Sequence, residues 1–349
     1  MRTRNRYVRV REMVGLAHCP IVVVSLLAIT RACVAQAAEN TDAPAPSTTS
    51  YPVKPVRVIE PFGVGGGPDL LARALAPRLA SLWGQAISVE NVTGGGATAG
   101  PECVANLPAD GYTLLINTNA QAYSAAFAKH LRYRPLEDFI PIIPLTRQPY
   151  VLVAGKATGV TNIGELIAKG KAAPGGLTFG STGIGTFTHI GGVAFGQAAG
   201  IQALHVPPLP TDSNADMIAN AVAGRFAFAF APIPLALPRI RDGTLVALGV
   251  STARRSTVLP DVPTIAESGL RGFDFPIWYG IWVRAGTPAV VVAKLERDLK
   301  QVLTDPKMLD WISAHGGERF SMSHAEFADF VRSESEHAER LVGGGVETE

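Results

Sequence analysis

Residues 57–73 constrain the fold of this chain more than any other segment. The apolar run 56–59 is typical of a buried parallel strand, and it leads into the glycine-rich loop 63–67. Pro68 suits the first turn of a helix, because an N–H at that position has no partner within the helix. A strand, a glycine loop and a helix in this order predict a βα unit whose helix N-terminus can receive an anion. A tight turn without a ligand is the alternative explanation for one such loop.

A second loop of the same kind follows the apolar strand 177–180 and precedes another helix. Between and after the two loops the chain alternates short apolar runs with helical periodicity, separated by turns that use many of its 36 glycines and 26 prolines. This alternation is typical of βαβ units. We predict an α/β fold with two lobes, each a mostly parallel sheet flanked by helices.

A chain of 349 residues has room for two such domains. We predict that residues 51–149 form the first part of lobe 1, that 150–274 form lobe 2, and that 275–349 return to lobe 1. A chain that crosses twice between lobes makes a two-strand hinge, which allows the lobes to close around a ligand.

The first 37 residues have the pattern of a signal peptide. Five arginines lie between positions 2 and 11, an apolar segment covers 20–30, and Ala35-Gln36-Ala37 fits a cleavage site. The apolar segment is shorter than the roughly 20 residues that span a membrane. An uncleaved signal anchor and a lipid-acceptor role for Cys33 are the alternatives. We expect a periplasmic protein in which residues 38–50 are a disordered linker.

Charge and motif content exclude several classes of function. The chain has 31 basic and 29 acidic residues, and without the leader 25 basic residues face 28 acidic ones, which leaves no basic surface typical of nucleic-acid binding. The sequence has no nucleophile elbow, no zinc-binding H-E-x-x-H and no phosphate-binding P-loop. We therefore expect a monomer that is not an enzyme and has no cofactor or metal; a hydrolase that pairs Asp69 with His189 on closure is the alternative.

Six short motifs occur in an order that resembles one known family. They are Pro61-Phe-x-x-Gly-Gly-x-x-Asp69, Glu90-Asn91, Asp110-Gly-Tyr-Thr-Leu-Leu115, Gly180-Ser-Thr-Gly-x-Gly185 with His189, Leu259-Pro-Asp-Val-Pro-Thr264 and Trp278-Tyr-Gly280. The ordered set resembles the Bug family, the solute-binding receptors of tripartite tricarboxylate transporters, from residue 51 to the C-terminus.

The resemblance implies a two-lobed periplasmic binding protein of the Venus-flytrap kind. It implies a small carboxylate ligand and transient delivery to membrane transporter subunits; a sensor that presents the same closed lobes to a signalling protein is the alternative. It also places one pincer loop at 62–69 and the other at 181–189. The candidate ligand-binding residues are Phe62, Gly63, Gly65, Gly66, Asp69, Asn119, Ser181, Thr182, Gly183, Thr186 and His189.

Six of these candidates also have local explanations. Asp69 bonds either nearby N–H groups or a water that bridges to the ligand. His189 donates either to the ligand or to a backbone carbonyl. The hydroxyls of Ser181, Thr182 and Thr186 either contact the ligand or cap the helix. Asn119 either lines the cleft or caps the next helix.

Three positions depart from the family pattern. Pro68 replaces a threonine, Pro208-Leu209-Pro210 replaces an aromatic-basic-glycine sequence, and Ala227 stands in an apolar run where an acidic residue is usual. Together these changes predict a less polar pocket than a citrate or amino-acid receptor needs.

Overall fold

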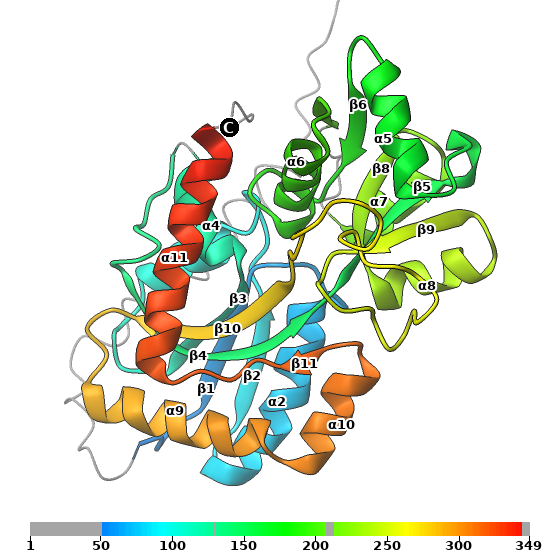
Figure 1. The fold of residues 1–349 in the computed structure, drawn as a ribbon. Helices are drawn as coiled ribbons and strands as arrows, with labels where there is room; N and C mark the ends of the chain where they lie inside the picture. Colours follow the sequence, from blue (N-terminus) through cyan, green and yellow to red (C-terminus); the bar gives the residue numbers. More distant parts are fainter. Residues whose placement is uncertain (1–50, 129, 207–212, 344–349) are drawn as a thin grey trace, which may run out of the picture. The chain divides into compact units, whose positions relative to one another are not determined.

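The computed structural model describes residues 51–128, 130–206 and 213–343. The predicted signal peptide (1–37), the predicted linker (38–50) and the departure at 208–210 lie outside these residues. The described chain forms two β-sheets with helices packed on them (Figure 1). None of the described helices is both long and apolar enough to cross a membrane.

The first sheet has the strand order β11-β4-β10-β3-β1-β2. Its strands are β1 (Val56–Glu60), β2 (Ile87–Asn91), β3 (Thr113–Thr118), β4 (Phe139–Gln148), β10 (Ile277–Arg284) and β11 (Glu318–Arg319). β1 is parallel to β2 and β3, whereas β10 is antiparallel to both β3 and β4. The prediction of a mostly parallel sheet is therefore wrong here. The chain leaves this sheet at the C-terminal end of β4 and returns in β10, directly beside β4. Because it returns at the end of β4 where it left, β10 has to run in the opposite direction.

The second sheet is mixed for a similar reason and has the order β7-β6-β8-β5-β9. Its strands are β5 (Tyr150–Gly155), β6 (Leu177–Gly180), β7 (Ala203–Val206), β8 (Phe228–Pro232) and β9 (Leu245–Val250). β6 is parallel to β7 and β8, while β5 is antiparallel to β8 and β9. Each sheet thus has a parallel part that follows the βα units and an antiparallel part that carries the crossing chain.

Helices cover both faces of the first sheet. Figure 1 shows α2, α9 and α10 on one side and α4 and α11 on the other. The described helices are α2 (Gly67–Trp83), α3 (Ala99–Ala105), α4 (Ala120–Phe127), α5 (Ile163–Ala172), α6 (Phe187–Ala199), α7 (Asn214–Val222), α8 (Ile233–Arg241), α9 (Ala289–Leu303), α10 (Pro306–Ala314) and α11 (His324–Gly343), with a short 3₁₀ helix, η1 (Lys156–Thr158). As predicted, α2 begins beside Pro68, and it ends at Gly84 in the left-handed conformation.

The apolar run 226–232 belongs to the core of the second sheet. Phe228 and Phe230 are fully buried in the cluster that includes α6, whereas Ala229 and Ala231 face the cluster formed with α7 and α8. Successive residues of a strand point to opposite faces, so one continuous apolar segment supplies both layers. Ala227 is half-buried against this core.

The two crossings between the sheets lie side by side and share one buried serine. β4 ends at Gln148 and β5 begins at Tyr150, while the return to β10 passes through Phe275. Tyr150 N–H donates to Ser251 Oγ (3.1 Å), Ser251 N–H donates to Tyr150 O (2.9 Å), and Phe275 N–H donates to Ser251 O (2.7 Å). Ser251 therefore holds the two crossings together at the hinge.

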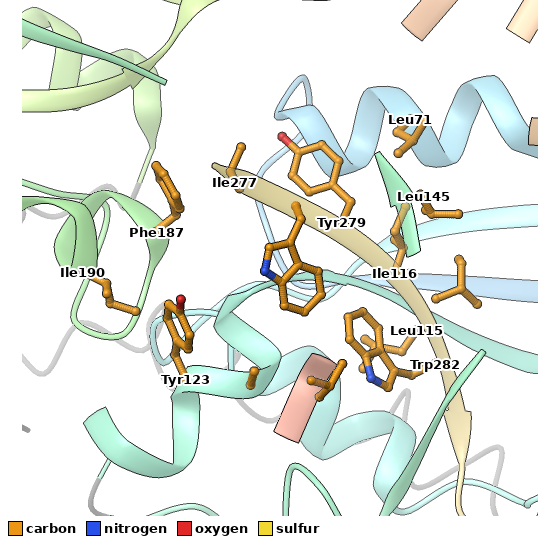
Figure 2. Close-up of a cluster of buried hydrophobic side chains, with 14 of the residues drawn as sticks. Leu71, Leu115, Ile116, Tyr123, Leu145, Phe187, Ile190, Ile277, Tyr279 and Trp282 are labelled. Atoms are coloured by element: carbon orange, nitrogen blue, oxygen red, sulfur yellow. The ribbon is translucent and has the colours of Figure 1, made fainter. Parts of the chain in front are cut away.

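β10 also lies at the centre of the largest cluster of buried side chains. Figure 2 shows Ile277, Tyr279 and Trp282 along this strand, with Tyr123 of α4 and Phe187 of α6 at one end. All five side chains belong to one continuous core cluster. The hinge strand is thus fixed by packing along its whole length.

The C-terminal helix α11 packs on this core and is also hydrogen-bonded to it through one carboxylate. Tyr123 Oη and Trp278 Nε1 both donate to Glu334 Oε2, each at 2.9 Å, and both aromatic side chains are buried. Removing a partner from a buried donor costs about 1–3 kcal/mol.

We therefore expect Glu334→Ala to lower the free energy of unfolding by about 2 kcal/mol, because it leaves two buried donors unpaired. Glu336→Ala, at an exposed position of the same helix, is the matched control. Urea denaturation measures both variants. An equal unfolding midpoint for the two would show that Glu334 does not anchor α11.

Candidate functional site

A cavity of about 180 Å³ opens where three helix N-termini meet. The loop before α2, the start of α6 and the start of α7 contribute most of its walls, and the others come from Tyr150 and Ile277 of the hinge, Thr118 of β3 and Leu235 of α8. Its described lining residues are Phe62, Gly63, Val64, Gly65, Gly66, Gly67, Pro68, Thr118, Tyr150, Thr182, Thr186, Phe187, Thr188, Ser213, Asn214, Ala215, Leu235 and Ile277. None of these is Asp, Glu, Lys, Arg or His.

Two carboxylates of the chain hold the first glycine loop in place. Phe62 N–H donates to Glu60 Oε2 at 2.5 Å, and Gly65 N–H donates to Asp69 Oδ2 at 2.8 Å. Asn91 Nδ2 links the pair, since it lies 3.3 Å from Glu60 Oε2 and 3.0 Å from Asp69 Oδ1. Asp69 also accepts a hydrogen bond from Arg73 Nε at 2.9 Å. The local alternative for Asp69 is therefore present. Three N–H groups of the loop are already occupied, because Gly66 N–H also donates to Gly63 O at 3.1 Å.

These two carboxylates differ in charge because their surroundings differ. Burial, reinforced by the nearby Asp69 charge, raises the pKa of Glu60 to about 8, although its hydrogen bonds with Phe62 and Asn91 oppose this. Its second oxygen, Oε1, is buried without a partner in the described part of the chain. Burial also opposes ionisation of Asp69, but hydrogen bonds from Arg73, Gly65 and Asn91 hold its pKa below the usual value. At neutral pH the pair therefore carries about one negative charge, which Arg73 balances.

Three threonine hydroxyls form a cluster at the start of α6. Thr182 Oγ1 lies 3.2 Å from Thr186 Oγ1 and 3.0 Å from Thr188 Oγ1. Thr182 N–H donates to Thr188 Oγ1 (2.9 Å), and Thr186 Oγ1 donates to Gly183 O (2.7 Å). Thr186 is the N-cap residue, yet its side chain does not cap the helix. The first-turn N–H groups of Phe187 and Thr188, which have no partner within a helix, lie in the same wall.

Behind this loop lies a pair of neutral histidines. Ser181 Oγ is 2.7 Å from His205 Nε2 and accepts a hydrogen bond from Gly183 N–H at 3.0 Å. The His189 ring lies 4.8 Å from that of His205, and its Nδ1 accepts from Gly185 N–H at 3.4 Å. Burial lowers the pKa of His189 to about 3, with a contribution from His205, and lowers that of His205 to about 4.

One ring atom of His189 and the amide of Asn119 are buried without hydrogen bonds. His189 Nε2 finds no partner among the described residues, so the backbone-carbonyl contact considered for it is absent from that part of the chain. Asn119 is the N-cap residue of α4, but its side chain does not cap that helix. The amide lies beside Tyr123, and neither its Nδ2 nor its Oδ1 has a hydrogen-bond partner within the described chain.

The structure brings together part of the candidate set. Phe62, Gly63, Gly65, Gly66, Thr182 and Thr186 line the cavity, whereas Asp69, Asn119, Ser181, Gly183 and His189 do not. Of the three departures, Pro68 lines the cavity, Ala227 does not, and 208–210 is outside the described residues.

Sequence reasoning missed several lining residues. Thr188 could have been found, because it lies two residues beyond Thr186 in the same first turn. Tyr150 and the 213–215 segment gave no signal, because only the fold carries them to the cavity.

The arrangement favours binding over acid–base chemistry. Asp69 is committed to Arg73, Asn91 and Gly65, and the His189 ring packs between Phe127 and Phe179, so neither faces the cavity. Within the described ranges, no group of three or more His, Cys, Asp or Glu could hold a metal ion. What the cavity offers is hydroxyls and main-chain N–H groups beside apolar side chains.

The raised pKa of Glu60 predicts how the stability of the folded protein changes with pH. An acid whose folded-state pKa exceeds its ordinary value binds a proton on folding, so stability falls as pH rises from about 4.5 to about 8. This pH-dependent part of the free energy of unfolding is at most about 1.4 kcal/mol per pH unit. We expect it to be absent in Glu60→Gln, because glutamine cannot ionise. Urea denaturation of both proteins at pH 5.5 and pH 8 measures it. Parallel pH profiles would contradict a buried, protonated Glu60.

The chain is similar in sequence to one family of receptors. Residues 71–344 match the family model TctC, described as the tripartite tricarboxylate transporter family receptor. A protein from the tcbD-tcbE intergenic region of Pseudomonas sp. strain P51 is 30% identical over 84% of this chain and 87% of its own length. Protein BugT of Bordetella pertussis is 29% identical over 82% of this chain and 88% of its own.

Two solved structures from Rhodopseudomonas palustris have the same fold and contain ligands. Rpa4515 with adipate is 28% identical, with a TM-score of 0.76, over 84% of this chain and 97% of that one. MatC with bound malate is 28% identical, with a TM-score of 0.75, over 84% of this chain and all of that one. The two-lobed fold and the resemblance to the Bug receptors are thereby confirmed, and the chain belongs to the TctC family of tripartite tricarboxylate transporter receptors.

Proposed function

We propose that the protein is a periplasmic solute receptor that captures a small organic acid and delivers it to the membrane subunits of a tripartite tricarboxylate-type transporter. The ligand lies between lobe 1, formed by residues 51–149 and 275–349, and lobe 2, formed by residues 150–274. The protein holds the acid without catalysing a reaction.

The observation that carries this proposal is the cavity between the N-termini of α2 and α6. A carboxylate there faces the positive ends of both helix dipoles, and the free first-turn N–H groups can donate to it. Hydrogen bonds to an ionised acceptor are roughly twice as strong as neutral ones. An arginine is therefore not required, in keeping with a lining that has no charged side chain among its described residues.

The α6 side is the stronger half of the anion site. On the α2 side, Glu60 and Asp69 occupy the N–H groups of Phe62 and Gly65, and Pro68 has none. On the α6 side, the cavity is lined by the three threonines that carry the hydroxyl cluster and by Phe187, and the first-turn N–H groups of Phe187 and Thr188 have no partner within the helix. We place the principal ligand carboxylate at α6.

The remaining walls set the character of the rest of the ligand. Most of the other lining residues are apolar or aromatic, namely Phe62, Val64, Tyr150, Ala215, Leu235 and Ile277, and the polar ones are Thr118, Ser213 and Asn214. Such walls favour a hydrocarbon body over the hydroxyl- or amine-bearing body of citrate or an amino acid. The ligand class is therefore a small carboxylic acid with an aliphatic or aromatic body, and the adipate and malate of the two neighbours are guides to its size. A sensor would use the same cavity, and only the membrane partner separates the two roles.

A thermal-shift screen tests the proposal directly. Aliphatic and aromatic mono- and dicarboxylates are titrated, with the corresponding neutral amides as controls. A ligand that binds only the folded state stabilises it by about 2.7 kcal/mol at a concentration of 100 Kd. We expect a concentration-dependent rise in Tm for at least one acid and none for its amide. If no acid raises the Tm, the ligand is not a carboxylate of the classes screened.

Thr188→Val tests the placement of the carboxylate at α6. The change keeps the side-chain shape but removes a hydroxyl from the threonine cluster, so we expect the affinity for the acid found in the screen to fall about tenfold, or about 1.4 kcal/mol. Thr178→Val, at an exposed position of β6, is the matched control. Calorimetric titration measures both. If Thr188→Val binds as the unaltered protein does, the carboxylate does not lie at this helix start.

A further inference from the structure

A second and larger cavity, of about 480 Å³, lies at the hinge. Its walls include Pro149 at the first crossing, Pro276 at the second, Glu318 of β11 and the loop 252–257 that follows β9. The first cavity contains Tyr150 and Ile277, the sequence neighbours of those two prolines. The two cavities therefore adjoin the same pair of crossing segments.

Three arginines line this hinge cavity, and they differ in whether an acidic side chain pairs with them. Arg147 pairs with Glu318 at 2.5 Å, and Arg255 pairs with Glu267 at 2.8 Å. Arg254 is exposed, and its guanidinium has no ion-pair or hydrogen-bond partner among the described residues. The other acid in the lining, Asp274, accepts the N–H of Ala253 at 2.9 Å.

We propose that this hinge cavity is a second anion site, which takes a small doubly charged oxyanion of the phosphate class. Arg254 supplies the free charge, and the planar guanidinium can bind two oxygens of one oxyanion at once. Arg147 and the Thr257 hydroxyl line the same cavity and can add donors. The volume falls within the range of small-molecule sites, about 300–1,000 Å³.

The position at the hinge gives such a site a consequence for ligand capture. Its walls come from β4 and β11 of the first sheet and from segments attached to the second sheet. A hinge movement that changes the angle between the two sheets changes the spacing of the walls in both cavities. A bound anion and a cleft ligand then alter each other's affinity by the same factor.

The test is calorimetric titration of the whole protein with inorganic phosphate at pH 7.5 and constant ionic strength. We expect saturable binding with a millimolar or lower Kd, weakened at least fivefold in Arg254→Ala and less in Arg254→Lys. Because the Arg254 side chain is exposed and unpaired, its removal leaves the fold intact. Arg241→Ala is the matched control, since Arg241 is an exposed arginine at the end of α8, outside this cavity.

Two results would overturn the hinge site. One is the absence of saturable phosphate binding at constant ionic strength, and the other is an Arg254→Ala protein that binds phosphate as tightly as Arg241→Ala does. Thr188→Val identifies the source of any binding that survives. If phosphate binding falls in Thr188→Val but not in Arg254→Ala, phosphate occupies the first cavity, at the start of α6, instead. The carboxylate screen does not depend on this outcome, so the two proposals fail separately.

Discussion

The structure of the binding site depends on how the N–H groups of one glycine loop are shared. A glycine loop before a helix exposes several donors, and every donor that the chain itself satisfies is lost to a ligand. Glu60 and Asp69 take the N–H groups of Phe62 and Gly65, and Asn91 joins the two carboxylates. The loop gains a fixed shape from these bonds, which is why we propose that the ligand's negative charge is received mainly by the loop that leads into α6.

The hinge strand links this loop to the rest of the fold. β10 pairs with β3 and β4, and its Tyr279 hydroxyl accepts a hydrogen bond from Gln148 Nε2 at 2.6 Å. A Cβ on Gly67 would lie 2.1 Å from that hydroxyl. Glycine is required there because the hinge tyrosine packs directly against the main chain. The first turn of α2 is thus positioned by the same strand that carries the chain between the sheets.

The position of these contacts suggests how binding and movement are connected. Ser251 bonds both crossings at one point, and residues of these crossings line both the cavity at the start of α6 and the arginine-lined cavity. A change of angle at this point would affect both cavities, because each has walls from both sheets. The sheets themselves are closely packed and resist deformation, so we expect any movement to be concentrated at the crossings.

The sequence by itself determined the local elements: the strand, glycine loop and helix units, the start of α2 beside Pro68, and the two loops that meet at the cavity. These follow from short-range rules of backbone conformation, which each segment carries alone. Only the tertiary structure decided that both sheets are mixed, that Asp69 serves its own loop, and that Tyr150 and the α7 start line the cavity. The physical reason is that direction, charge pairing and burial arise between segments far apart in the chain, and a single sequence does not encode those distances in any local pattern.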